Sequence, residues 1–116
     1  MNINSKIKEA LLKKSQGDIS GAESIFLEIL DFSPLQYEVL INLGLINVHK
    51  KRYEESINYF KKAKEADKNN IDPYINLGNV YTLQKKYTNA IQFFELAHKI
   101  DQANLNVINN LSFFIF

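Results

Sequence analysis

Apolar residues recur three and four positions apart along most of this chain, which is the spacing of one helix face. Ala90, Phe94 and Ala97 form one such series, and Leu77 and Tyr81 belong to another. A stripe of this kind is typical of an amphipathic α-helix that buries one side. The pattern predicts helices at about residues 4–15, 19–32, 37–50, 53–66, 71–84, 87–100 and 105–116.

The helical pattern repeats at a fixed offset of 34 residues. Residues 37–70 and 71–104 align without a gap, and both contain the sequence INLG, which begins at Ile41 in one copy and at Ile75 in the other. An earlier copy fits residues 3–36 in the same register. A repeat of this length indicates a helical solenoid, and such chains work through a continuous binding surface more often than through a catalytic pocket.

The residues within each copy indicate how the helices would pack. Gly44 and Gly78 are small enough to let paired helices approach closely, and Phe60 and Phe94 would fill the space opposite. Alternating small and large residues in this way gives the close packing of a protein interior. Gly17 is a candidate turn residue between the first two helices.

The period and this residue set resemble the tetratricopeptide repeat family. The copy at 71–104 matches the family pattern at Leu77, Gly78, Tyr81, Tyr87, Ala90, Phe94 and Ala97. It departs where Tyr74 stands in place of the usual tryptophan and where Gln102 replaces the usual proline. The resemblance implies an all-α, right-handed superhelical solenoid of antiparallel helix pairs. It would form a single domain over residues 1–116, with repeats at about 3–36, 37–70 and 71–104 and a partial repeat or capping helix at 105–116.

Composition excludes several functional classes. The net charge is +1, so nothing attracts the chain strongly to nucleic acid or to an anionic membrane. No stretch approaches the roughly 20 apolar residues that span a bilayer. The first residues, MNINSKIKEALLKK, lack the continuous apolar core of a signal peptide, so we expect a cytoplasmic location.

No combination of residues in the sequence indicates catalysis. His49 and His98 lie at unrelated repeat positions, and neither has a second ligand at helical spacing that would suggest a metal. Glu54 and Glu55 are adjacent, and neighbours in a helix point apart. We therefore expect no metal, no cofactor and no enzymatic activity.

In the tetratricopeptide family, the first helix of each repeat lines a concave groove that binds peptides. The matching positions in this chain are Ile7, Lys8, Leu11, Ile41, Asn42, Leu45, Ile75, Asn76, Asn79 and Asn110. Asn42, Asn76 and Asn110 form a row at the repeat spacing. A carboxamide is both donor and acceptor, so each could bond to the backbone of an extended peptide. Alternatively, the row is inherited with the repeat and is only solvated.

Some tetratricopeptide domains hold the C-terminal carboxylate of a chaperone in a clamp of lysine, arginine and asparagine. The matching positions here are Ile7, Leu11, Asn42, Asp72 and Asn76. Only Asn42 agrees with that clamp, and Asp72 would repel a carboxylate. We therefore do not expect this mode of binding.

The C-terminal segment is unusually apolar, because residues 113–116 read FFIF and one helix face cannot bury all of them. Three interpretations stay open: a fragment of a longer array, a self-association surface, or a segment that covers the groove or docks on a membrane or a partner. Self-association would use Ile108, Leu111, Phe113, Phe114 and Phe116.

The sequence as a whole predicts a protein–protein interaction scaffold or adaptor. It would bind an extended or helical peptide segment of a partner protein in the groove. The alternative is a structural self-assembly module, a homo-oligomer that acts through the apolar C-terminal helix.

Overall fold

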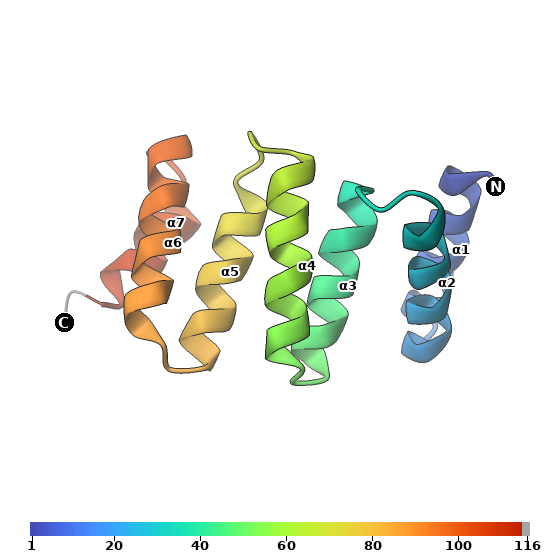
Figure 1. Cartoon of the computed structure of the whole chain (residues 1–116). Coiled ribbons are helices and arrows are strands. Elements are labelled where there is room, and N and C mark those ends of the chain that lie inside the picture. Colours follow the sequence, from blue (N-terminus) through green and yellow to red (C-terminus); the bar gives the residue numbers. More distant parts are fainter. Residues whose placement is uncertain (115–116) are drawn as a thin grey trace. The chain divides into compact units, whose positions relative to one another are not determined.

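The computed structural model describes residues 1–114, and all regular structure in that range is α-helical. The helices are α1 (Ile3–Ser15), α2 (Ile19–Phe32), α3 (Tyr37–His49), α4 (Tyr53–Ala66), α5 (Asp72–Leu83), α6 (Tyr87–Ile100) and α7 (Leu105–Ser112) (Figure 1). The sequence pattern places the first six to within one residue at each end.

The second helix of each pair follows the sequence period in its start, end and length. Helices α2, α4 and α6 begin at Ile19, Tyr53 and Tyr87, and each is 14 residues long. These starts are 34 residues apart, the offset that aligns the copies in the sequence. The periodicity of the sequence is therefore a periodicity of structure, including the first pair of helices.

Consecutive helices form antiparallel pairs, α1 with α2, α3 with α4, and α5 with α6 (Figure 1). The turn inside each pair contains one residue in the left-handed backbone region: Gly17 with φ of 85°, Lys51 with φ of 60° and Lys85 with φ of 61°. Glycine adopts this conformation without strain, whereas a residue with a β-carbon does not. Gly17 is thus the turn residue that the sequence predicts, and lysines hold the same position in the later copies.

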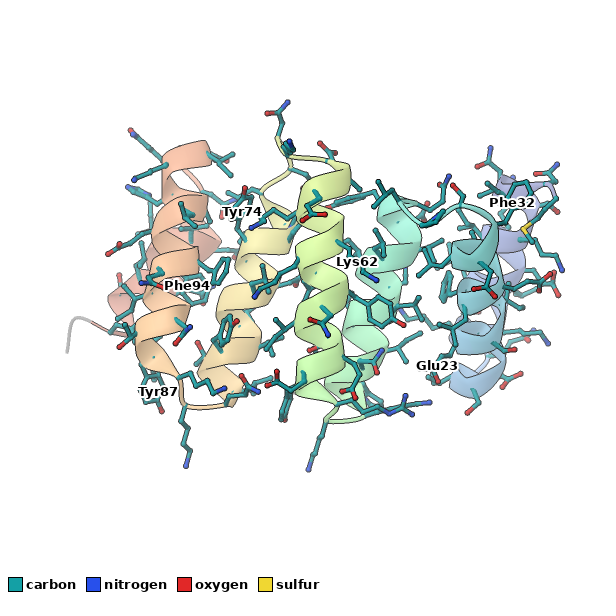
Figure 2. The ribbon with its side chains drawn as sticks, viewed as in Figure 1. Glu23, Phe32, Lys62, Tyr74, Tyr87 and Phe94 are labelled. Carbon is teal, nitrogen blue, oxygen red and sulfur yellow. The ribbon has the colours of Figure 1, made fainter. Side chains whose placement is uncertain are left out.

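A glycine facing a phenylalanine ring holds two of the pairs together. Gly44 on α3 lies against the ring of Phe60 on α4. Gly78 on α5 lies against the ring of Phe94 on α6, and Phe94 is labelled in Figure 2. A β-carbon built on either glycine would overlap the ring. Both phenylalanines are fully buried. This confirms the interpretation that small residues admit large ones within a pair.

The chain divides into two compact units, Met1–Ala66 and Asp67–Phe116, which we call the N-terminal unit and the C-terminal unit. The core of the N-terminal unit contains Ile7, Ala10, Ala22, Ile25, Phe26, Ile29, Val39, Leu43 and Ile46. The C-terminal unit buries Leu77, Val80, Tyr81, Ala90, Phe94, Ala97 and Val107.

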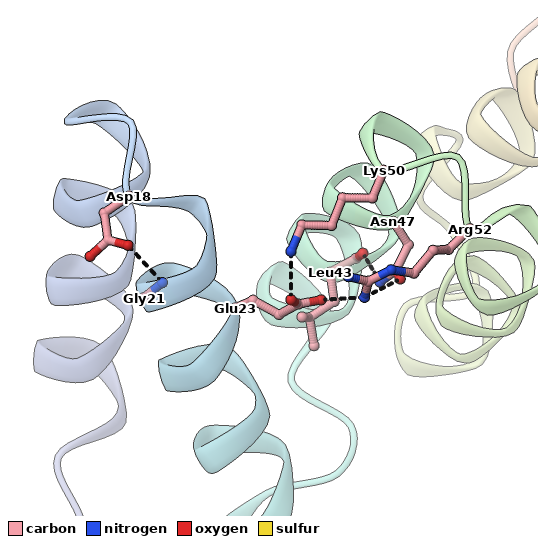
Figure 3. Close-up of polar contacts among 7 residues, drawn as sticks. All are labelled: Asp18, Gly21, Glu23, Leu43, Asn47, Lys50 and Arg52. Atoms are coloured by element: carbon pink, nitrogen blue, oxygen red, sulfur yellow. Dashed lines mark hydrogen bonds and ion pairs between the residues drawn. The ribbon is translucent and has the colours of Figure 1, made fainter.

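A polar network joins α2 to the end of α3 inside the N-terminal unit (Figure 3). The Glu23 carboxylate accepts from Lys50 Nζ at 2.9 Å and from Arg52 Nη1 at 3.2 Å, and its side chain is only 16% exposed. The Asn47 carboxamide donates to the Leu43 carbonyl at 2.8 Å. Burial raises the pKa of the nearby Tyr59 hydroxyl, and the Glu23 carboxylate raises it further. The two bonds to the Glu23 carboxylate are charge-assisted, and such bonds are stronger than hydrogen bonds between neutral groups.

Helix α7 ends at Ser112, earlier than the sequence pattern predicts. The Phe113 N–H donates to the Asn109 carbonyl, and the Phe114 N–H donates to the Leu111 carbonyl in a tighter turn. The Phe114 ring lies 5.8 Å from that of Tyr87, between centroids, and 6.2 Å from that of Phe94. The chain turns here because Phe114 finds apolar surface on α6.

Candidate functional site

Helices α1, α3 and α5 are the first helices of their pairs, and α7 corresponds to the first helix of a fourth copy. The predicted groove residues differ in exposure. Lys8, Leu45 and Asn79 are exposed, and Leu11, Ile41, Ile75, Asn76 and Asn110 are half-buried. We call these eight side chains the first-helix residues. The other two are buried, Ile7 at 7% exposure within the core and Asn42 at 9%.

The Asn42 carboxamide is engaged at both ends inside the N-terminal unit. Its Nδ2 donates to the Glu38 carbonyl at 2.9 Å, one helical turn earlier. Its Oδ1 accepts from Lys14 Nζ at 3.1 Å, and Lys14 belongs to α1. A peptide backbone could bond to Asn42 only by displacing these partners. The residue joins two first helices as the structure stands.

Asn76 holds the same place in the second INLG sequence but has different surroundings. Its side chain is half-buried on α5, and within residues 1–114 no hydrogen bond reaches its carboxamide. Both the donor and the acceptor of this amide are available to a ligand. Asn79, one turn further along α5, is exposed.

A pocket of about 330 Å³ lies against α5, α6 and α7 in the C-terminal unit. It is lined by Asn79, Thr82, Phe94, Asn109, Asn110, Phe113 and Phe114. Two of these residues belong to the predicted groove and two to the predicted self-association surface. The sequence pattern assigns the two pairs to different surfaces, and the structure brings all four residues to one pocket.

A smaller pocket, of about 190 Å³, lies between the first helices of the N-terminal unit. Its lining residues are Lys14, Ile19, Leu45, Ile46 and His49. Leu45 is among the groove residues that the sequence predicts, and Lys14 is not. The signal for Lys14 is its spacing, since it follows the predicted groove residue Leu11 by one helical turn.

The predicted self-association residues also differ in exposure. Phe113 is 66% exposed and Ile108 is exposed, whereas Leu111 and Phe114 are half-buried. Phe116 lies outside the described residues. Leu105, at the start of α7, adds a further exposed apolar side chain.

Within residues 1–114, no group of three histidine, cysteine, aspartate or glutamate residues could hold a metal ion. None of the helices in that range is both long and apolar enough to cross a membrane.

Comparison with known proteins identifies the repeat. Residues 35–103, more than half of the chain, match the family described as tetratricopeptide repeat. The chain belongs to the tetratricopeptide repeat family. The predicted all-α solenoid of helix pairs is thereby confirmed as its fold class. The match does not include most of the first copy, residues 3–36. The assignment of that copy depends on the 34-residue offset in the sequence and on the bounds of α1 and α2. No curated protein matches the chain at a significant level.

Solved tetratricopeptide structures share this fold at low sequence identity. MamA matches with a TM-score of 0.88 at 18% identity, over 97% of this chain and 66% of its own. The first repeat domain of Spaghetti (RPAP3), bound to the HSP90 peptide SRMEEVD, matches with a TM-score of 0.85 at 14% identity, over 95% of this chain and 87% of its own.

A third structure extends the comparison. The second repeat domain of human RPAP3, in complex with the HSP70 peptide SGPTIEEVD, matches with a TM-score of 0.83 at 18% identity, over 93% of this chain and 90% of its own. Identities this low establish the fold and leave ligands undetermined.

Proposed function

We propose that this chain is a protein-interaction scaffold or adaptor that binds a peptide segment of a partner through its first-helix residues. The observation that carries the proposal is the Asn76 carboxamide. Its donor and acceptor are without a partner among the described residues, on a helix whose other side is buried. Such a group suits the alternating N–H and C=O groups of an extended peptide.

The solved relatives support this proposal in general terms. Two of them are bound to peptides from other proteins, and each covers 93% or more of this chain. Their ligands are not transferred here, because Ile7, Leu11 and Asp72 replace the basic and polar residues of the family's carboxylate clamp. We propose a binding role without catalysis, in the cytoplasm, with residues 1–116 acting as one tetratricopeptide domain.

A peptide-display selection against the whole chain would test the proposal. Binding of the enriched peptides is measured by calorimetry for the wild type and for Asn76→Ala. Asn89→Ala is the matched control, because Asn89 is exposed on α6, a second helix of the same unit. The proposal expects a weaker complex for Asn76→Ala alone. Enrichment of no peptide, or equal binding by all three proteins, would contradict it.

Self-assembly through α7 is the second candidate function, and one observation favours it. Leu105, Ile108 and Phe113 are exposed apolar side chains on or directly after one short helix. Exposed apolar residues gathered in this way often mark a contact surface.

Sedimentation velocity over a range of protein concentrations distinguishes the candidates. Self-assembly expects a mass that rises with concentration and returns to that of a monomer in the double variant Ile108→Ser and Phe113→Ser. If the chain stays a monomer at all concentrations, the self-assembly function is contradicted and the proposed scaffold function still stands. Phe114 is left unchanged in this test, because its ring packs against Tyr87 and Phe94 in its own unit.

A further inference from the structure

Lys14 places a positive charge beside the apolar pocket of the N-terminal unit. The pocket walls are mainly the side chains of Ile19, Leu45 and Ile46. Lys14 is half-buried, and its Nζ donates to the neutral Asn42 Oδ1 at 3.1 Å. An ammonium group has three N–H donors, so two remain for a ligand after this bond.

Among residues 1–114, no carboxylate forms an ion pair that would neutralise this charge. Within residues 1–114 no ion pair involves Lys14, whereas Lys13, its neighbour in the sequence, pairs with Asp18 at 3.8 Å. Asn42 therefore acts as a positioning residue, which holds the Lys14 side chain across from α1 to α3. A half-buried cation beside apolar walls gains from an anionic partner more than a solvated lysine does.

The first helices of the two units also differ in net charge. Helices α1 and α3 contain four lysines and two glutamates, a net charge of +2 with histidine neutral. Helices α5 and α7 contain one aspartate and no other charged residue, a net charge of −1. The charge complementary to the first helices of the N-terminal unit is therefore negative.

We propose that this pocket is a subsite for an aliphatic side chain next to an acidic side chain, within an internal segment of a partner protein. The aliphatic group would enter between Ile19, Leu45 and Ile46, and the neighbouring carboxylate would accept from Lys14 Nζ. This deepens the proposed function, on which it rests, by naming the chemistry of the ligand.

The size of the pocket fits one side chain. At about 190 Å³ it is smaller than the roughly 300–1,000 Å³ of a small-molecule site. His49 lies at the same pocket and is exposed, so it can contact the segment that follows the bound side chain.

Four short peptides with blocked ends test the two parts of the ligand separately. The parent is acetyl-Gly-Ser-Leu-Glu-Ser-Gly-amide, and the others replace leucine by alanine, glutamate by glutamine, or both. Each is titrated into the whole ¹⁵N-labelled chain, and backbone amide shifts give both the affinity and the location of binding. A fifth peptide that ends in a free leucine carboxylate separates a chain terminus from an acidic side chain.

The protein variants isolate the charge of Lys14. Lys14→Met removes it, and Lys14→Arg retains it. Lys62→Met is the matched control, because Lys62 is exposed on α4 of the same unit. Leu45→Ser removes the apolar wall. The dispersion of the amide spectrum reports whether each variant is folded.

The proposal expects the parent peptide to shift amides around Leu45, Ile46 and His49. The glutamine peptide should bind about two- to fivefold more weakly, as is ordinary for a partly solvated ion pair. That difference should disappear in Lys14→Met and at 1 M salt, and persist in Lys14→Arg and Lys62→Met. Leu45→Ser should weaken the binding of the two peptides that contain leucine, and should change the binding of the two alanine peptides much less.

Three outcomes would overturn it: equal binding of the glutamate and glutamine peptides, preference for the free carboxylate peptide, or shifts confined to α5 and α7. The last outcome removes this subsite and leaves the proposed function standing. That function fails separately, if peptides selected by display bind independently of Asn76.

Discussion

Asn42 and Asn76 occupy the same position in two copies of INLG, and the structure gives them different tasks. Asn42 is buried and bonds to Lys14 and to the Glu38 carbonyl. Asn76 is half-buried, and no hydrogen bond reaches its carboxamide within residues 1–114. The comparison shows that two copies of a repeat can share a motif and still differ in the role of its asparagine. In the first copy, a residue distant in the sequence, Lys14, occupies the carboxamide oxygen.

The largest expected effect concerns packing that both copies share. Phe60→Ala and Phe94→Ala should each lower the free energy of unfolding by about 3–5 kcal/mol, because each removes a fully buried ring. Urea denaturation followed by circular dichroism measures the loss. Similar losses in both variants would support equivalent packing of the two pairs, and near-normal stability of either would contradict the repeat register.

The Glu23 network belongs to the N-terminal unit, and 34 residues later the sequence has Ile57 instead. Glu23→Gln should lower the free energy of unfolding by about 1–2 kcal/mol, because two charge-assisted bonds at a nearly buried carboxylate weaken.

Glu28→Gln is the matched control for that network, since Glu28 is on the same helix and is half exposed. Its ion pair with Lys6 at 3.9 Å should contribute less than about 0.5 kcal/mol. Equal losses in the two glutamine variants would show that the Glu23 network contributes nothing beyond an ordinary surface pair.

Truncating the two asparagines sharpens the comparison itself. Asn42→Ala should lower the free energy of unfolding by about 1 kcal/mol, because it leaves Lys14 without its acceptor. Asn76→Ala should change it by less than about 0.5 kcal/mol, since no internal bond is lost. Chemical denaturation of both variants under one set of conditions measures the difference. A larger loss of unfolding free energy for Asn76→Ala would mean that Asn76, and not Asn42, is the asparagine that stabilises the fold.

The smallest expected effects lie in the turns. Lys51→Gly and Lys85→Gly should each raise the free energy of unfolding by about 0.5–1 kcal/mol, because both lysines hold a left-handed backbone. Gly17→Ala should lower it by about 1 kcal/mol for the same reason. A loss of stability in both lysine variants would mean that their side chains contribute more than the strain they introduce.

The sequence predicts the helices and their pairing because these depend on spacing alone. The period fixes where α2, α4 and α6 begin, and Gly44 with Phe60 indicates how one pair packs. The site is harder to predict. Nothing in the INLG sequence indicates that Lys14, 28 residues before Asn42, would engage its carboxamide.

The C-terminal segment shows the same limit in a different way. Its spacing continues to predict helix through residue 116, and the structure ends α7 at Ser112. The turn depends on the apolar surface that Tyr87 and Phe94 offer to Phe114, which is tertiary information. The pocket shared by Asn79, Asn110 and Phe113 follows from that turn and is invisible to a repeat alignment.

The most direct test of the account is the affinity of a display-selected peptide for Asn76→Ala, with Asn89→Ala as control and with stability measured on the same samples. The account predicts a complex weakened about three- to tenfold in Asn76→Ala, as for a lost hydrogen bond, with unfolding unchanged in both variants. Wild-type affinity in Asn76→Ala would contradict it, because the free carboxamide would then have no part in binding.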